Sequence, residues 1–200
     1  MTRSIPIEKI LGDCLIAWAM NGEALRPEQG YPARLVVPGW EGNMWVKWIR
    51  RLEFGDKPYM TREETSKYTD LLTDGKARMF TWVMEAKSVV TSPSPEKPIH
   101  RKGIQQLRGL AWSGNGKIKR VDVSLDGGKN WRTAQLHAPI MTKSLVRFTL
   151  PFEWRGEELL IQSRAMDETG YVQPYIQDLQ KIRGKNSIYH NNSIATWLVS

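Results

Sequence analysis

Two basic residues, Arg34 and Lys47, lie within stretches whose neighbours are mostly apolar. A charged side chain on a half-buried strand must be paired or face solvent, because burying it unpaired is costly. One interpretation places both residues on a solvated sheet face. The other assigns them to a phosphate group, for which arginine offers two parallel donors and lysine a point charge. The pattern of apolar residues leaves both interpretations open.

Residue types that commonly bind metals are few in this sequence. Cys14 is the single cysteine, which excludes an internal disulfide and any multi-cysteine zinc or iron–sulfur site. It precedes the apolar residues 15–17, so we expect it to act as a small hydrophobic side chain. The histidines His100, His137 and His190 are too widely spaced to form a metal motif. The sequence therefore predicts no metal ligand within this chain.

The net charge of +8 and the pI of about 9.6 predict an anionic partner. Nucleic acid is the general candidate, but the positive charges form no long runs and no RNA- or DNA-binding motif is evident. An anionic cofactor together with a small oxyanion would require the same sign of charge, so charge alone leaves the partner open. No apolar run approaches the roughly 20 residues of a membrane-spanning helix, and residues 1–10 lack the apolar stretch of a secretory signal.

The first part of the chain must position Arg34 and Lys47 on short strands. Residues 15–20 form an apolar strand candidate that leads into Asn21-Gly22, a two-residue hairpin signal because both turn positions need a positive φ. A further strand is expected at residues 34–37, which end at a proline and a glycine.

Two longer stretches follow. Residues 45–54 alternate between apolar and charged side chains, which predicts a strand. Its apolar face would hold Val46, Trp48, Leu52 and Phe54. Residues 59–74 are polar and lack clean periodicity, so we expect a long loop with one short helical turn.

Residues 91–98 contain three prolines in eight positions, which predicts a boundary between domains. Beyond them, short strands recur with turns between them. They are expected at residues 107–113, 118–125, 131–136, 145–150, 158–165 and 194–199. Regular short strands over about 100 residues predict an immunoglobulin-like sandwich. The expected fold class is mainly β (α+β), with one domain at residues 1–92 and a second at residues 93–200.

Residues 30–39, with the sequence GYPARLVVPG, and the following Val46-Lys47-Trp48 resemble the pterin-binding signature of the sulfite oxidase family. The matching arginine and lysine of that family contact molybdopterin. The resemblance therefore implies that Arg34 and Lys47 bind this cofactor. The family often has a histidine just before the glycine of this motif. Gln29 stands there in this sequence, and we expect it to make a remodelled cofactor contact.

Tyr68 follows Lys47 by 21 residues, the separation at which a tyrosine of the family reaches the molybdenum site. The resemblance implies a catalytic tyrosine, and the alternative is a tyrosine that anchors the loop. Arg183 lies close to the position from which the family directs an arginine of its second domain to the substrate anion. Its rival for this role is Arg164, a strand arginine that we expect to be solvated.

The second part of the chain resembles the dimerisation domain of the same family. The matching stretches are residues 109–114, 121–128, 131, 165–167 and 172–174. Residues 17–23 and 186–192 are most similar to the molybdenum subunit of sulfane dehydrogenase, the SoxC type. This resemblance implies a homodimer formed through the C-terminal domain, a c-type cytochrome subunit as partner, and a periplasmic location for the complete enzyme.

The complete enzyme implied by the resemblance carries molybdopterin (Mo-molybdopterin). It oxidises a reduced sulfur compound, sulfite or a protein-bound sulfane, and passes electrons to the cytochrome. The cysteine that holds molybdenum in this family belongs to a region before the residues of this chain, so we expect a truncated chain that is inactive in isolation. The alternative is a non-catalytic dimerisation or assembly module.

Overall fold

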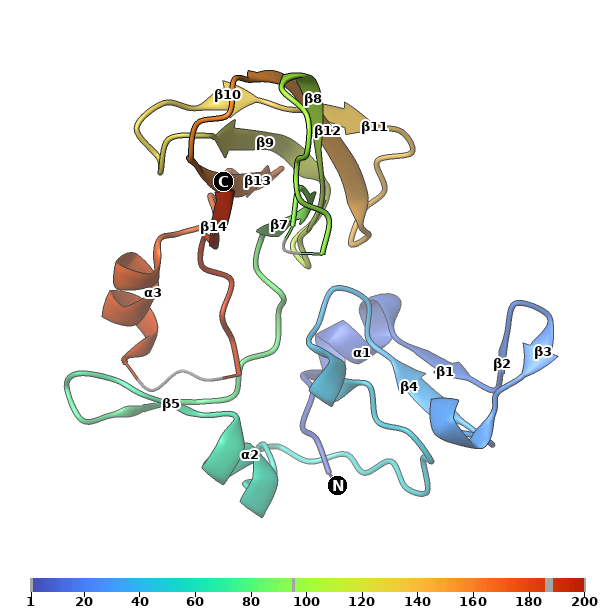
Figure 1. The fold of residues 1–200 in the computed structure, drawn as a ribbon. Coiled ribbons are helices and arrows are strands. Elements are labelled where there is room, and N and C mark those ends of the chain that lie inside the picture. Colours follow the sequence, from blue (N-terminus) through green and yellow to red (C-terminus); the bar gives the residue numbers. More distant parts are fainter. Residues whose placement is uncertain (1, 95, 186–188, 200) are drawn as a thin grey trace. The chain divides into compact units, whose positions relative to one another are not determined.

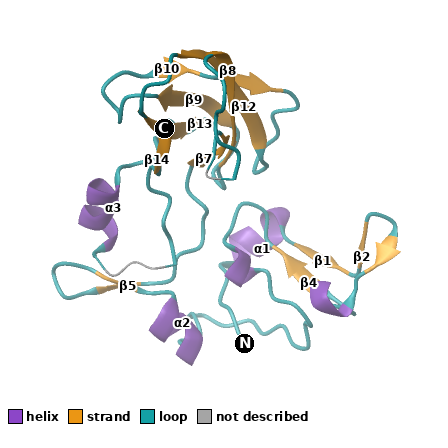
Figure 2. Ribbon diagram, viewed as in Figure 1, coloured by secondary structure: helices purple, strands orange, loops and turns teal. Residues whose placement is uncertain are grey.

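The computed structural model describes residues 2–94, 96–185 and 189–199, and it divides the chain into two compact units (Figure 1). Unit 1 comprises residues 1–83 and 183–190, and unit 2 comprises residues 84–182 and 191–200. Strands hold 36% of the residues and helices 14%, which confirms the mainly β fold class (Figure 2). No helix in the described ranges is long and apolar enough to span a membrane. Residues 186–188, part of the second SoxC-type motif, lie outside the described residues.

Unit 1 consists of short elements joined by long irregular stretches. They are α1 (Ile7–Asp13), β1 (Leu15–Ala17), β2 (Ala19–Met20), β3 (Glu23–Ala24), the 3₁₀ turn η1 (Pro27–Gln29), β4 (Arg34–Val36), the 3₁₀ turn η2 (Gly42–Met44), α2 (Arg62–Lys67), β5 (Asp70–Leu71) and β6 (Ala77–Arg78). β1 pairs with β4, which confirms the strand expected at residues 34–37. Asn21 and Gly22 have φ angles of 55° and 83° between the paired strands β2 and β3, which confirms the predicted hairpin.

A small apolar cluster packs around β4. Its buried members are Leu35, Val37, Trp40 and Met44. The indole rings of Trp40 and Trp82 stack against each other, with centroids 5.1 Å apart. Cys14 is half-buried and packs against this cluster, so it has the environment of a small apolar side chain.

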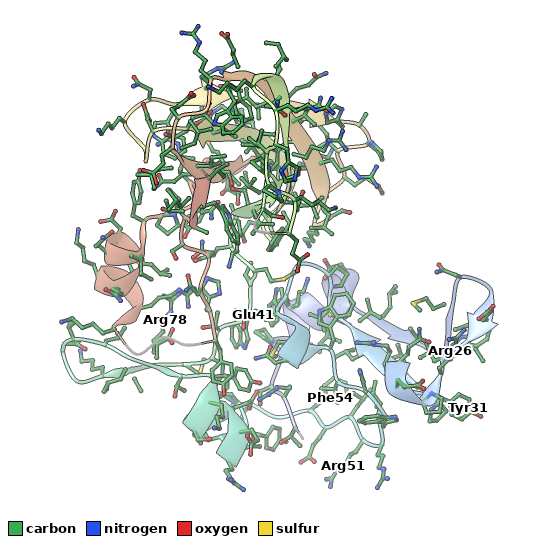
Figure 3. All side chains as sticks on the ribbon, viewed as in Figure 1. Arg26, Tyr31, Glu41, Arg51, Phe54 and Arg78 are labelled. Atoms are coloured by element: carbon green, nitrogen blue, oxygen red, sulfur yellow. The ribbon has the colours of Figure 1, made fainter. Side chains whose placement is uncertain are left out.

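The strand predicted at residues 45–54 is wrong. This segment is irregular and continues to residue 60, and Leu52 and Phe54 are 59% and 81% exposed. Arg51 and Phe54 mark its course in Figure 3. The physical reason begins at Trp48, whose φ of 54° lies in the left-handed region and interrupts the extended backbone. Alternation predicts a strand only where a neighbouring strand can complete its hydrogen bonds.

The stretch at residues 59–74 contains more regular structure than expected. The predicted helical turn is confirmed as α2. A short hairpin then follows, because β5 pairs with β6 through Asp70↔Arg78 and Leu71↔Ala77. Two-residue strands carry too few side chains for a periodic pattern. The turn between them contains Asp74-Gly75, with a φ of 81° at Gly75, which is a hairpin signal that the sequence reasoning missed.

Unit 2 is a sandwich of two four-stranded antiparallel sheets. Its elements are β7 (Lys87–Ser92), β8 (Gly103–Trp112), β9 (Ile118–Ser124), β10 (Arg132–Thr133), β11 (Gln135–His137), β12 (Val146–Trp154), β13 (Leu159–Asp167), α3 (Ile176–Arg183) and β14 (Thr196–Val199). One sheet has the strand order β10-β9-β13-β14 and the other β11-β12-β8-β7. Five of the six strands predicted in this part are thus confirmed. The single strand predicted at residues 131–136 is wrong, because the chain passes from one sheet to the other there and forms the two short strands β10 and β11. α3 and β7 were not anticipated. Arg183, the last residue of α3, is counted with unit 1.

The core of unit 2 follows the period of two expected for half-buried strands. On β12, the residues from Val146 to Trp154 are buried at every second position, and Phe148 is fully buried. A buried glutamine, Gln173, adds a polar connection. Its side-chain oxygen accepts hydrogen bonds from Ser88 N on β7 at 2.8 Å and from Ala165 N on β13 at 3.1 Å. This one side chain therefore links the two sheets.

The structure divides the chain between Val83 and Met84, whereas the sequence predicted a division between residues 92 and 93. The difference arises from β7, which precedes the prolines and pairs with β8 inside the sandwich. Residues 91–98 therefore connect two strands of one sheet. Ser94 and Lys97 close the connection with an antiparallel bridge.

Candidate functional site

Arg34 and Lys47 meet at Gly30. Arg34 lies at the start of β4, and the hydrogen bond from Leu35 N to Val46 O, at 2.8 Å, brings the following residue Lys47 alongside. Gly30 has a φ of 112°, and a Cβ atom there would lie 2.9 Å from the Cβ of Lys47 and 3.1 Å from that of Arg34. Only glycine fits this position without displacing its neighbours, because it adopts positive φ and has no side chain.

Backbone carbonyl groups hold both cations. Arg34 Nη1 donates to Gln29 O at 3.0 Å and Nη2 to Trp45 O at 3.4 Å, while Lys47 Nζ donates to Glu28 O. In the described part of the chain, neither side chain forms a salt bridge. Their positive charges are therefore oriented but not neutralised by carboxylates.

The donor set at Gly30 fits an anionic group. Arg34 Nε is buried and has no hydrogen-bond partner among the described residues. A buried donor without a partner is unfavourable, and an anionic oxygen would satisfy it with a charge-assisted hydrogen bond. Lys47 is exposed and keeps donors available beyond its carbonyl partner. This arrangement suits the phosphate of an anionic cofactor.

Gln29, for which we expect a remodelled cofactor contact, takes part in the loop that precedes Arg34. Its side-chain oxygen accepts a hydrogen bond from Arg26 N at 3.0 Å, which closes the η1 turn. Its backbone oxygen orients Arg34. Arg26 O also accepts a hydrogen bond from Tyr31 N at 3.1 Å, which closes the turn on its other side. Arg26 and Tyr31 are labelled in Figure 3. The described contacts of Gln29 shape the loop that carries the two cations.

Tyr68 follows α2 directly. Its backbone N donates to Glu64 O at 3.2 Å and its carbonyl accepts from Thr81 N at 3.3 Å. The Arg3 guanidinium lies 4.2 Å from the centroid of its ring, and the ring of Tyr189 lies 4.8 Å away. These contacts hold the ring, as expected of a loop anchor. The hydroxyl has no hydrogen-bond partner among the described residues, so it remains available for a ligand.

Arg183 is 2% exposed, and its charge is paired within unit 1. Nη1 lies 3.2 Å from Asp70 Oδ2 and donates to Thr81 Oγ1 at 3.0 Å. Thr81 also contacts the backbone of Tyr68, so the structure brings Tyr68 and Arg183 to the same short segment. A guanidinium with a carboxylate partner can stabilise an incoming anion only in competition with that partner.

Arg164, the rival of Arg183, belongs to unit 2 and was expected to be solvated. It is instead half-buried on β13, where its Nε lies 3.3 Å from Asp122 Oδ2. Its guanidinium stacks over the ring of Trp131 at 4.2 Å. These contacts are those of a structural residue on the sheet.

The sequence reasoning missed Arg3 and Glu64, both of which contact the Tyr68 region. Thr61 and Glu64 have the spacing of a helix capping box, which would have drawn attention to Glu64. The structure directs its carboxylate elsewhere, because Glu64 Oε1 accepts from Ser4 N at 3.0 Å. No sequence pattern indicated Arg3. In the ranges that the structure describes, no three His, Cys, Asp or Glu side chains are grouped as a metal site.

Comparison with protein families assigns both parts of the chain. Residues 1–63 match the oxidoreductase molybdopterin binding domain, and residues 78–197 match the Mo-co oxidoreductase dimerisation domain. The second match by itself covers more than half of the chain.

Individual relatives agree with these matches. Sulfite oxidase of Gallus gallus is 35% identical over 188 residues, which cover 86% of this chain and 40% of that protein. The NADPH nitrate reductase of Mycosarcoma maydis is 33% identical over 146 residues, covering 62% of this chain and 15% of that protein. The crystal structure of the sulfane dehydrogenase SoxCD from Paracoccus pantotrophus is 64% identical, with a TM-score of 0.94, and the match covers 99% of this chain and 51% of that chain.

The chain thus spans about half or less of the length of these relatives. Molybdopterin is the cofactor of the complete enzymes to which these matches point. The matches to both family domains, together with the likeness to the sulfane dehydrogenase structure over nearly the whole chain, confirm the resemblance noted in the sequence. This chain belongs to the sulfite oxidase family of molybdopterin oxidoreductases and is of the SoxC type.

Proposed function

We propose that this chain forms the C-terminal portion of a molybdenum-dependent dehydrogenase that oxidises a reduced sulfur compound, either sulfite or a protein-bound sulfane. The observation that carries the proposal is the pair of cations at Gly30, oriented by carbonyls and not neutralised, with Arg34 Nε lacking a partner among the described residues. The sulfite oxidase and sulfane dehydrogenase relatives support a sulfur substrate.

Each site residue has its own task in this proposal. Arg34 and Lys47 bind the anionic phosphate of the cofactor, and Gln29 orients Arg34 through its backbone carbonyl. When bound, molybdopterin supplies the molybdenum at which oxygen-atom transfer to sulfur occurs. Tyr68 directs its hydroxyl towards the reacting group as a hydrogen-bond donor. Arg183 contributes positive charge for the substrate anion.

We extend the proposal to partners through unit 2. The match to a dimerisation domain supports a homodimer, and closed two-fold symmetry is the commonest arrangement of such assemblies. The name SoxCD of the solved relative supports a second subunit, for which we propose a c-type cytochrome that accepts the electrons. The corresponding location is the periplasm. The dimerisation domain also suits a non-catalytic assembly module, and a complete assembly without molybdenum or electron transfer would favour that alternative.

Cofactor content tests the roles of Arg34 and Lys47. In the complete enzyme, Arg34→Ala and Lys47→Ala should each lower molybdenum and pterin content, measured by elemental analysis and by fluorescence of the oxidised pterin. Arg51→Ala is the matched control, because Arg51 is exposed on the following loop and pairs with Glu53. Full cofactor content in the Arg34→Ala, Lys47→Ala double variant would refute the cofactor site.

Steady-state kinetics test Tyr68 and Arg183. Tyr68→Phe keeps the ring and should lower kcat while cofactor content stays unchanged. Arg183→Lys keeps a charge next to Asp70 but removes the planar donor fork, so it should raise KM for an anionic sulfur substrate. Arg164→Lys is the control in unit 2. An effect of Arg164→Lys alone would place the substrate arginine on β13.

A further inference from the structure

Arg3 and Glu64 surround Tyr68 from parts of unit 1 that are distant in sequence. Arg3 precedes α1 and Glu64 lies on α2, one helical turn before Tyr68. The Arg3 guanidinium lies 4.2 Å from the centroid of the Tyr68 ring. At that distance a cation is attracted to the face of an aromatic ring, so the position of Arg3 and the orientation of the ring depend on each other.

Arg3 is itself held in place. Its Nε donates a hydrogen bond to Asn43 O at 3.0 Å, which ties it to the η2 turn. The next residue, Ser4, is fixed at two points. Ser4 N donates to Glu64 Oε1 at 3.0 Å, and Ser4 Oγ accepts from Tyr59 N at 2.8 Å. The segment that carries Arg3 is therefore attached both to α2 and to the stretch that leads into it.

Glu64 supplies the opposite charge in this cluster. Its side chain is 1% exposed. Burial raises its pKa, whereas the hydrogen bond from Ser4 and the charge of Arg3 act in the opposite direction. A buried carboxylate that an arginine stabilises in turn favours that arginine's position. Tyr68 N donates to Glu64 O at 3.2 Å, so the helix turn that carries the carboxylate also carries the tyrosine.

We propose that Arg3 is a positioning residue for Tyr68: its guanidinium, hydrogen-bonded to Asn43 O and carried by a segment that Glu64 holds through Ser4 N, keeps the ring oriented so that the hydroxyl points towards the reacting group. This inference rests on the proposed role of Tyr68 in sulfur oxidation. A merely structural Arg3 would stabilise the segment before α1 and leave turnover unchanged once the protein is folded.

A double-mutant cycle in the cofactor-loaded enzyme separates the two roles. Arg3→Met keeps much of the side-chain volume and removes the charge. It should lower kcat about five- to tenfold, as expected for loss of one cation–π contact, with little change in KM. Arg3→Lys retains a cation and should recover part of the rate. In the Tyr68→Phe background, where the hydroxyl is already gone, Arg3→Met should cost nothing further. Independent, multiplicative losses would overturn the proposal.

A second measurement does not depend on activity. With ¹³C-labelled tyrosine, the ring resonances of Tyr68, assigned through Tyr68→Phe, should shift in Arg3→Met and stay in place in Arg62→Gln. Arg62 is an exposed arginine of α2 and serves as the matched control. Unchanged Tyr68 resonances in Arg3→Met would refute the positioning role. If the wild-type enzyme oxidises no sulfur compound, the proposed function fails, and the ring resonances still decide whether Arg3 orients Tyr68.

Discussion

Unit 2 and unit 1 are stabilised in different ways. The sandwich of unit 2 has long strands with alternating burial and a continuous apolar core. Unit 1 has strands of two or three residues, a small apolar cluster and several buried polar or charged side chains, among them Glu64, Asp70 and Arg183. Polar groups and an irregular backbone carry the candidate site. Unit 2 also buries polar side chains, Gln173 among them, but they lie within a large apolar core that supplies most of its stability. The apolar cluster of unit 1 is smaller, so individual polar contacts contribute more to its shape.

The largest effect should come from the core of unit 2. Phe148 is fully buried on β12, so Phe148→Ala should lower the free energy of unfolding by about 3–5 kcal/mol through lost burial and the cavity left behind. Urea denaturation followed by circular dichroism measures it. Ile104→Ala, at a residue 77% exposed on β8, should change stability by less than about 0.5 kcal/mol. Equal losses of unfolding free energy in Phe148→Ala and Ile104→Ala would contradict the view that burial in the apolar core stabilises unit 2.

Breaking the ion pair of unit 1 should rank next. Asp70→Asn leaves Arg183 buried without its carboxylate and should cost about 3 kcal/mol. The loss lies at the low end of the usual range because Thr81 Oγ1 still accepts from Arg183. Thermal unfolding monitored by tryptophan fluorescence provides the measurement. Asp74→Asn, at an exposed turn residue 3.8 Å from Lys76, should be nearly neutral.

A glycine substitution tests the site itself. Gly30→Ala should destabilise the protein by about 1–2 kcal/mol and lower cofactor content, because the new Cβ would crowd Arg34 and Lys47 at a positive φ. Gly12→Ala is the matched control. It lies in α1 with open space around it, so alanine should slightly stabilise the helix. Normal cofactor content in Gly30→Ala would show that cofactor binding does not require glycine at this position.

The buried carboxyl of Glu64 should make the stability of unit 1 depend on pH. Because burial raises its pKa in the folded state, its contribution to stability is present below pH 4.5 and is lost as the pH rises through the folded pKa. Glu64→Gln should therefore gain stability relative to the unsubstituted protein between pH 4.5 and neutral pH. Urea titrations at a series of pH values would show this as a difference that increases with pH, and a constant difference would contradict it.

The smallest effect should have the opposite sign and lie in unit 2. Hydrogen bonds from Asn130 and Ser124 lower the pKa of Asp126 from 3.8 to about 2. Its contribution is therefore present above pH 3.8 and is lost as the pH falls towards 2. Carboxyl ¹³C titration should give this low pKa directly. Asn130→Ala removes the side-chain hydrogen bond but keeps the larger contribution of the backbone N–H, so it should raise the pKa only part of the way towards 3.8. A measured pKa near 3.8 for Asp126 in the unsubstituted protein would show that this carboxyl does not contribute to the stability of the folded state.

The sequence by itself determined most of unit 2 and the identity of the two cations. Short strand candidates that recur between turn residues indicated β8, β9, β12 and β13. Asn21-Gly22 indicated a hairpin through its positive φ angles. Arg34 and Lys47 were found from a motif, which specifies residue types and spacing.

Only the tertiary structure decided how these residues meet. Gly30 brings Arg34 and Lys47 together through a close approach that no periodic pattern records. Trp48 bends the chain out of the strand that alternation predicted. Arg183 donates a hydrogen bond to Asp70, which lies 113 residues away in the sequence. The Arg3 guanidinium packs over the ring of Tyr68, although Arg3 lies near the start of unit 1. Contacts between distant residues depend on the packing of whole elements, whereas periodicity reports only which face of each element is buried.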